Sequence, residues 1–198
     1  MSQTVHLVDA SMYVFRAWHS MPDEFRDADD QPVNAVHGFT RFVLELIERH
    51  RPARLVFAFD IALESNFRNG LFPAYKANRD PAPEELKRQF AYCQDICRAL
   101  GFEVLAHASY EADDLIGSAL AHVRRLGHVG TILSADKDLA QLLGDGDLQW
   151  DYARNESWRA DEVKARAAQR AAACFDTLDA HLAAHGPYLL GERMSAAD

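Results

Sequence analysis

The sequence has few basic residues relative to acidic ones, and it has no long apolar run. Its 21 Lys and Arg against 30 Asp and Glu give a formal net charge of −9 over 198 residues. Such a chain is not expected to bind nucleic acid with its whole surface, so any nucleic-acid site must be a local basic patch. No apolar run is long enough to cross a bilayer, and the first residues lack the charged and apolar regions of a signal peptide. We therefore expect a cytoplasmic protein with no membrane partner.

Cysteine is also scarce, which excludes a disulfide scaffold. There are three cysteines, and the four-residue spacing of Cys93 and Cys97 fits no metal motif. We interpret this pair as small, buried or half-buried residues of a helix in a reducing compartment. The hydrophobic fraction of 48% is nevertheless high enough for a real core. The length suits one domain, with or without an appendage.

Short apolar runs alternate with helical patterns over most of the chain. Strand, helix and strand joined by short loops indicate right-handed βαβ units and a mostly parallel sheet. The predicted strands are residues 5–9, 55–60, 102–105 and 129–134, with 147–151 as a fifth, edge strand. The predicted helices are residues 36–50, 83–100, 111–126 and 161–185, with a short one after 134.

One acidic stretch carries more charge than its position explains. Glu111, Asp113 and Asp114 place three carboxylates at the start of a helical apolar pattern. Acids in a first helical turn suit the helix dipole, which accounts for one or two of them. It does not account for three beside buried positions, because unpaired carboxylates repel one another and resist desolvation. A divalent cation such as Mg²⁺, which takes carboxylate oxygens, removes that conflict.

Further acids follow the predicted strands. Asp9 and Asp60 end the first two strands, although Asp9 alone fits a turn or a helix N-cap equally well. In an open α/β sheet the carboxyl ends of the strands meet at one edge, where ligands bind. The sequence therefore predicts a carboxylate pocket that binds divalent metals and hydrolyses a phosphodiester. The seven acids are Asp9, Asp60, Glu111, Asp113, Asp114, Asp136 and Asp138.

Residues 61–82 form the clearest basic and aromatic stretch. Such a mixture suits a surface that tracks a single-stranded backbone and stacks on bases, although its composition also fits a solvated loop. Because it follows the Asp60 strand, it could bring a phosphate backbone to the metals, with Lys76 or Arg79 offsetting transition-state charge. Its members are Phe67, Arg68, Phe72, Tyr75, Lys76 and Arg79.

Five motifs occur in one order along the chain. They are Asp9-x-Ser11-x-Tyr13-x-x-Arg16-Ala17, Phe59-Asp60, Phe72-Pro73-x-Tyr75-Lys76-x-x-Arg79, Glu111-Ala112-Asp113-Asp114-x-Ile116-Gly117 and Ser134-x-Asp136-Lys137-Asp138-x-x-Gln141-Leu142. Together they resemble the 5′-3′ exonuclease and flap endonuclease family, found as the N-terminal domain of bacterial DNA polymerase I and as free-standing enzymes. The resemblance covers about residues 4–166. Each motif alone is a weak signal, but the ordered set is specific.

The resemblance implies a PIN-like α/β fold and a nuclease that acts on DNA with 5′ ends or 5′ flaps, using one or two Mg²⁺ or Mn²⁺ ions. By motif matching, the first six of the seven acids would bind one metal directly or through water, and Asp138 would help to hold a second. Lys76 and Arg79 would be catalytic and would lie with Tyr75 in an arch around the 5′ strand. The other implied DNA contacts are Tyr13, Arg16 and Arg68.

The resemblance ends near residue 166. There the family continues into a second acidic motif, Gly-Asp-x-x-Asp-Asn, and a helix-three-turn-helix, neither of which occurs in residues 167–198. We therefore divide the chain into a nuclease domain, residues 1–166, and an atypical helical tail, residues 167–198. With a second metal poorly supplied, a catalytically weak, structure-specific DNA-binding module is an alternative function.

The tail has a resemblance of its own. Its stretches Phe175-Asp176-x-Leu178-Asp179-x-His181-Leu182 and Pro187-Tyr188-Leu189-Leu190-Gly191-Glu192-Arg193 resemble part of the C-terminal helical domain of glutathione transferases. No thioredoxin-like glutathione site precedes them, so transferase activity is not expected. We expect residues 167–185 to form an amphipathic helix that packs against the core or a second copy of the chain. The side chains expected to be buried are Cys174, Phe175, Leu178 and Leu182.

A third function, a Mg²⁺-dependent phosphoryl-transfer protein, also fits an acidic pocket. A phosphatase of the haloacid-dehalogenase type needs Asp-x-Asp after its first strand, and Asp9-Ala10-Ser11 lacks the second acid. A response-regulator receiver would have fewer carboxylates and no basic stretch. Both fit less well than the nuclease.

Overall fold

A six-stranded sheet runs through the computed structural model, which describes residues 2–22, 24–61, 66–76 and 81–185. The strand order is β3-β2-β1-β4-β5-β6. All neighbours are parallel except β5 and β6. The strands are β1 (Thr4–Asp9), β2 (Leu55–Asp60), β3 (Glu103–His107), β4 (Val129–Leu133), β5 (Leu148–Asp151) and β6 (Glu156–Trp158). The predicted PIN-like α/β fold is confirmed.

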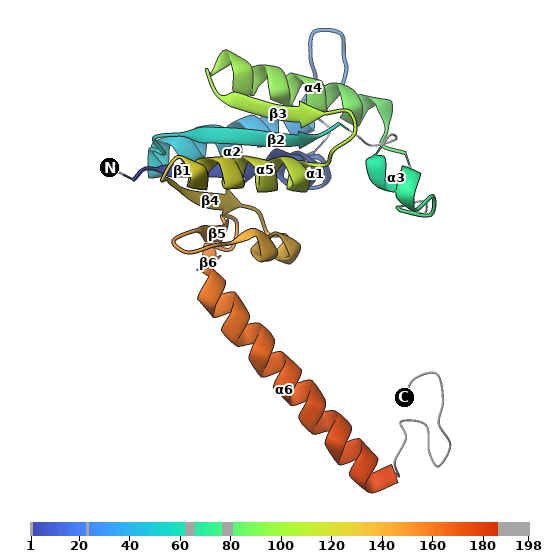
Figure 1. Ribbon diagram of the computed structural model, residues 1–198. Coiled ribbons are helices and arrows are strands. Elements are labelled where there is room, and N and C mark those ends of the chain that lie inside the picture. Colours follow the sequence, from blue (N-terminus) through green and yellow to red (C-terminus); the bar gives the residue numbers. More distant parts are fainter. Residues whose placement is uncertain (1, 23, 62–65, 77–80, 186–198) are drawn as a thin grey trace.

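Helices cover both faces of the sheet (Figure 1). Helices α1 (Ala10–Ser20), α2 (Asn34–His50) and α4 (Glu84–Ala99) pack together on one face, and α5 (Ala112–Arg125) packs on the other. Strand β2 shows why both faces are filled: Phe57 and Phe59 enter the cluster under α1, α2 and α4, and Ala58 enters the cluster under α5. Side chains alternate between the faces of a strand, so a continuous apolar run fits a sheet covered on both sides.

Two elements differ from the sequence-based expectation. The strand predicted as the edge, β5, lies inside the sheet, because the three-residue antiparallel strand β6 pairs with it. The stretch that composition also allowed as a solvated loop contains a short helix, α3 (Phe67–Leu71), capped by the Asn66 side chain. The predicted short helix after β4 is a 3₁₀ helix, η1 (Lys137–Leu142).

The C-terminal helix α6 (Ala160–His185) starts before the predicted tail and projects away from the sheet (Figure 1). Only its first turns touch the domain, where Ala160 and Val163 pack partly against the α5-side cluster. No residue of α6 is buried, and Phe175 is 66% exposed. The expected packing of the tail on its own core is therefore wrong. Its Ala-rich sequence favours a helix, but it carries too few large apolar side chains to gain much from burial.

Among the described helices, none combines the length and apolar character that a membrane span requires.

Candidate active site

The acidic residues gather where the order of the strands reverses. β1 lies between β2 and β4, so the chain leaves β1 toward one side and later returns on the other. Asp9 is the last residue of β1, Asp60 is the last residue of β2, and Asp136 follows β4. Parallel strands place these ends at one edge, and such a reversal is where open α/β sheets bind ligands.

Asp9 is the most deeply placed of these acids. It caps α1 by accepting the Met12 N–H at Oδ1 (3.2 Å), and its Oδ2 accepts the Ser134 hydroxyl (2.9 Å). The pKa of Asp9 is raised to about 7, mainly by burial and also by the charges of Asp113 and Asp60. The two hydrogen bonds lower it and offset part of this rise. The N-cap interpretation of Asp9 is thus correct. The same carboxylate is also costly to ionise, because it is buried beside other acids.

Asp113 lies on the first turn of α5, close to several other acids. Its pKa is raised to about 6, mainly by burial and also by the charges of Asp136, Asp60 and Glu111. Within the described ranges, no hydrogen bond or ion pair reaches its carboxylate. Five carboxylates, three at strand ends and two at the start of α5, therefore act on one another.

The start of α5 explains part of the acidic stretch. Glu111 is its N-cap and forms a capping box with Asp114, whose Oδ2 accepts the Glu111 N–H (3.1 Å). Asp60 Oδ1 accepts the Ala112 N–H (2.6 Å), and the Asp60 N–H donates to Ser11 Oγ (2.6 Å). Acids thus satisfy N–H groups that a helix start leaves open. This capping fixes β2 to α5 and holds Asp113 between them.

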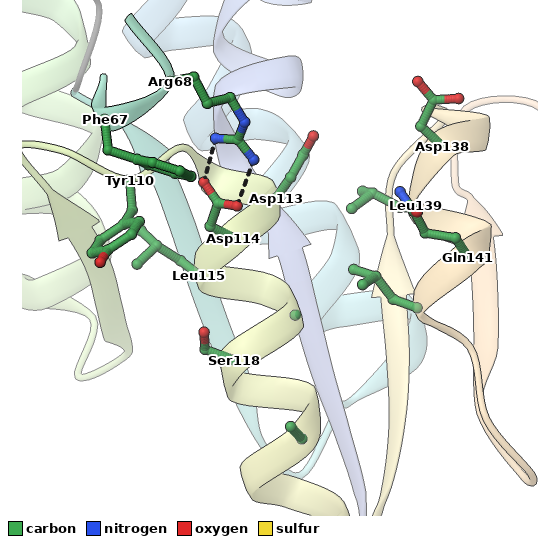
Figure 2. Close-up of a pocket in the computed structure, with 13 residues that line it drawn as sticks. Phe67, Arg68, Tyr110, Asp113, Asp114, Leu115, Ser118, Asp138, Leu139 and Gln141 are labelled. Carbon is green, nitrogen blue, oxygen red and sulfur yellow. Dashed lines mark hydrogen bonds and ion pairs between the residues drawn. The ribbon is translucent and has the colours of Figure 1, made fainter. Parts of the chain in front are cut away.

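Two of the acids are neutralised by the basic and aromatic stretch. Arg68 donates two hydrogen bonds to Asp114, both 2.7 Å, as Figure 2 shows. Lys76 Nζ lies 2.6 Å from Glu111 Oε1. Arg68 lowers the pKa of Asp114 through this bidentate hydrogen bond. The described part of the stretch therefore faces the acidic site, as predicted. Its cations Arg68 and Lys76 form ion pairs with two of the acids themselves.

Glu111 has two further partners. The Asn66 amide donates to Oε1 (2.5 Å), and the Tyr75 hydroxyl donates to Oε2 (3.2 Å). Asn66 also caps α3, so one side chain connects that helix to α5. Asn66 was not a predicted site residue. Its signal in the sequence was only its position before the Phe67–Arg68 pair.

Whether the residues fit a metal can be judged from the acids. In the part of the chain that the structure describes, no three His, Cys, Asp or Glu residues are close enough to hold an ion. The donor chemistry nevertheless fits a hard cation, since Asp9 and Asp113 are costly to ionise where they stand. The ligand set would close once Glu111 and Asp114 turn from Lys76 and Arg68 toward an ion.

The remaining predicted residues lie at different distances from this centre. Asp138 is exposed on η1 and lines, with Asp113 and Asp114, an open groove of about 650 Å³ along α5. In Figure 2 its carboxylate points away from Asp113. Its N–H donates to Asp136 Oδ1 (2.9 Å). Arg79 falls outside the described residues.

Tyr13 lies in the core of the domain. Its ring is 4% exposed and stacks on Phe42, with centroids 3.8 Å apart. It is therefore a core residue in this structure, and its contact with DNA stays a prediction. Arg16, one helical turn further along α1, is exposed at the rim of a separate groove that Tyr13 and Tyr152 also line.

Comparison with known proteins shows the family and the fold of this chain. Residues 4–173 match the family described as "5′-3′ exonuclease, N-terminal resolvase-like domain". A DNA polymerase I of Rhizobium leguminosarum is 35% identical over 157 residues, which is 76% of this chain and 15% of that protein. A 5′-3′ exonuclease of Aquifex aeolicus is 31% identical over 161 residues, which is 81% of this chain and 55% of that protein. The chain thus spans about half or less of these relatives.

Solved structures show the same fold at low identity. A bacteriophage T5 5′-exonuclease with bound zinc has a TM-score of 0.62 at 20% identity, and the match covers 79% of this chain and 58% of that one. A T5 flap endonuclease in a complex with DNA and metal ions has a TM-score of 0.59 at 19% identity, with the same coverage. From the family match and the curated relatives, this chain belongs to the 5′-3′ exonuclease family, of which it contains the N-terminal resolvase-like domain.

Proposed function

We propose that this chain hydrolyses phosphodiester bonds of DNA at 5′ ends or 5′ flaps with a divalent metal, Mg²⁺ or Mn²⁺. The observation that carries the proposal is the mutual effect of carboxylates from three strand ends and α5, with the pKa of Asp9 near 7 and that of Asp113 near 6. Separate elements bring these carboxylates together, and a bound cation or a proton is needed to offset their mutual repulsion. The relatives' names, exonuclease and DNA polymerase I, support the same reaction.

The residues would divide the work as follows. Asp9, Asp60, Asp113 and Asp136 would hold one ion, with Glu111 and Asp114 joining them and Asp138 serving a second. A bound ion would activate water and stabilise charge on the phosphate. Lys76 and Arg68 would bind the phosphates on either side of the scissile bond, and Tyr75 would stack on an unpaired base. We expect Arg79 to act beside Lys76.

The ion pairs of Arg68 and Lys76 would couple the binding of metal to the binding of DNA. Each cation now neutralises an acid, so DNA phosphate and the acids compete for the same two side chains. A divalent ion at Glu111 and Asp114 would remove that competition and free both cations for phosphate. We therefore expect metal and DNA to bind with positive coupling, each raising the affinity for the other.

The test uses a labelled 5′-flap duplex with Mg²⁺ or Mn²⁺. We expect metal-dependent release of the flap, and no release by Asp113→Asn. Binding of the flap without cleavage in either metal would indicate a DNA-binding module instead. Hydrolysis of a small phosphomonoester with no action on DNA would indicate a phosphoryl-transfer enzyme. An Asp95→Asn variant, altered on the exposed face of α4, is the matched control for loss of one carboxylate.

A further inference from the structure

A buried amide on β5 holds the turn that carries Asp136. Gln149 is 0% exposed, and its Nε2 donates to the backbone oxygens of Ser134 (3.1 Å) and Asp136 (2.5 Å). These two carbonyls flank Ala135 and face the same amide. Without this donor, the carbonyl of the buried Ser134 would lose a hydrogen bond, which is costly inside a protein.

The orientation of this amide is fixed from its other end. Gln149 Oε1 accepts the indole N–H of Trp158 on β6 (3.2 Å). Because indole only donates and carbonyls only accept, one orientation of the amide satisfies all three partners and the flipped one satisfies none. The short edge strand β6 thus has a role beyond extending the sheet: it sets which way Gln149 points.

The turn that Gln149 holds connects two acids of the site. Ser134 is 0% exposed, and its hydroxyl donates to Asp9 while accepting the Asp136 N–H (3.1 Å). Asp136 in turn accepts the N–H of Asp138. One amide therefore supports a continuous series of hydrogen bonds from β6 to the carboxylates at the ends of β1 and β4.

We propose that Gln149 is a positioning residue that holds Asp136 and the Asp9–Ser134 pair in the geometry that binds the divalent ion, with Trp158 orienting its amide. The inference rests on the proposed function for the metal itself. Residues that orient metal ligands typically change metal affinity by about 10–100-fold when they are replaced. Gln149 contacts no predicted ligand side chain, so it acts only through the backbone and Ser134.

Gln89 is a matched control within the same chain. It is also 0% exposed, and it also bridges backbone groups: its Oε1 accepts the N–H groups of Ala35 (2.7 Å) and Val36 (3.2 Å). These contacts lie at the start of α2, among residues that carry no predicted ligand. Gln89→Met and Gln149→Met thus remove the same group from two equally buried places.

The experiment measures Mn²⁺ affinity by the paramagnetic resonance of free Mn²⁺. We expect Gln149→Met to weaken the affinity by about 10–100-fold and Gln89→Met to leave it unchanged, although both lower the melting temperature in EDTA. Trp158→Phe, which removes only the indole N–H, should give a smaller loss than Gln149→Met. Equal affinity in Gln149→Met and the wild type, or equal losses in the two glutamine variants, would overturn the proposal.

Hydrogen exchange separates this proposal from the proposed function. Without metal, the amides of Asp136 and Asp138 should exchange faster in Gln149→Met than in Gln89→Met. Their acceptors, Ser134 Oγ and Asp136 Oδ1, belong to the two residues whose backbone carbonyls Gln149 holds. Two results together would refute the metal site but support the positioning role. The wild type would bind no Mn²⁺, and the two glutamine variants would still differ in exchange. Unchanged exchange in both Gln149→Met and Trp158→Phe would refute the role itself, and Trp158→Phe also serves if Gln149→Met does not fold.

Discussion

Asp113 and Asp114 are adjacent, yet they are in opposite electrostatic environments. Asp114 is held by two hydrogen bonds from Arg68, which lower its pKa, whereas burial and three neighbouring acids raise the pKa of Asp113. A buried carboxylate with a raised pKa does not stabilise the fold, because ionising it inside the protein costs stability at neutral pH. Such a residue suits a site that gains its cation from outside.

Metal binding should therefore stabilise the fold. A ligand that binds only the folded state adds about 2.7 kcal/mol at a hundredfold excess over Kd, which for a chain of this size raises the melting temperature by roughly 5–10 °C. Mg²⁺ or Mn²⁺ should produce such a rise, and Asp113→Asn with Asp114→Asn should abolish it. Scanning calorimetry with and without EDTA measures the shift. A rise of the same size in the double variant would refute the site.

The metal-free protein should lose stability as pH rises. Asp9 and Asp113 have folded pKa values of about 7 and about 6, above the ordinary value of 3.8. The folded state then holds protons that the unfolded state releases, so stability is greatest below about pH 4 for this term and falls through pH 7. Urea unfolding in EDTA at pH 5, 6, 7 and 8 should show this fall. Asp113→Asn should flatten it, and saturating Mg²⁺ should reduce it.

At the scale of elements, α3 and the residues up to Lys76 act as one basic segment against α5. Arg68 also lies over the Phe67 ring (4.7 Å) and Lys76 over the Tyr75 ring (5.1 Å), so the cations and the aromatic rings share one surface. Cations that already face aromatic rings match a strand whose phosphates and bases alternate.

Replacing the cations of this segment should change how DNA affinity depends on salt. Each phosphate contact contributes about 0.7–0.9 to the slope of log affinity against log salt. Lys76→Ala with Arg79→Ala should weaken binding of a 5′-flapped DNA and reduce that slope by about 1–2. Fluorescence anisotropy over a salt series measures both quantities.

Two comparisons complete this test. Tyr75→Ala should weaken single-strand binding by about 1–3 kcal/mol through lost stacking. Arg98→Ala should change nothing, since Arg98 lies at the end of α4, just before β3 begins and away from the acidic edge. DNA affinity that ignores the changes at Lys76, Arg79 and Tyr75 would make this segment a solvated loop.

The sequence predicted long elements well and short ones poorly. Strands such as β1, β2 and β4 are continuous apolar runs because helices cover both of their faces, and this pattern is visible without a structure. β6 is three residues, Glu156–Trp158, with no apolar run to reveal it. Its partner β5 therefore looked like an edge.

The same contrast applies to the site. Acids at strand ends were predictable, since strand direction alone brings them together. The ion pair of Arg68 with Asp114 was not, because it joins residues 46 apart whose approach depends on α3. Gln149 gave no signal at all: a single glutamine in a strand becomes informative only when its two carbonyl partners are seen.

At the scale of the whole molecule, the domain and α6 are nearly independent. The helix has no buried residue, and its contact with the domain is confined to the region of Ala160 and Val163. Net charge is −9, so the chain repels DNA at long range except at the basic segment. A duplex anchor beyond the domain would therefore contribute more here than in a basic protein.

The last prediction concerns the activity of the 198-residue polypeptide. The acids that the motif match assigns to the first metal lie around the acidic edge, with Glu111 and Asp114 paired to Lys76 and Arg68. Asp138 is the one acid that the match assigns to a second ion. A two-metal mechanism needs one ion for the attacking water and another for the leaving oxygen, and weak grip on the duplex costs positioning. We expect one well-occupied metal site and flap cleavage that depends on metal but is slow.

Replacing residues from about 167 onward with a family-type C-terminal region should then raise the cleavage rate. The exchange is structurally mild, because residues 167–185 contribute no buried side chain and Ala160 and Val163 are kept. A chain that ends at residue 166 is the control: its melting temperature should match the full chain, and its cleavage should stay weak. Mg²⁺-dependent cleavage by the unmodified chain at the rate of the exchanged one would mean that a second ion already finds its ligands among the seven acids.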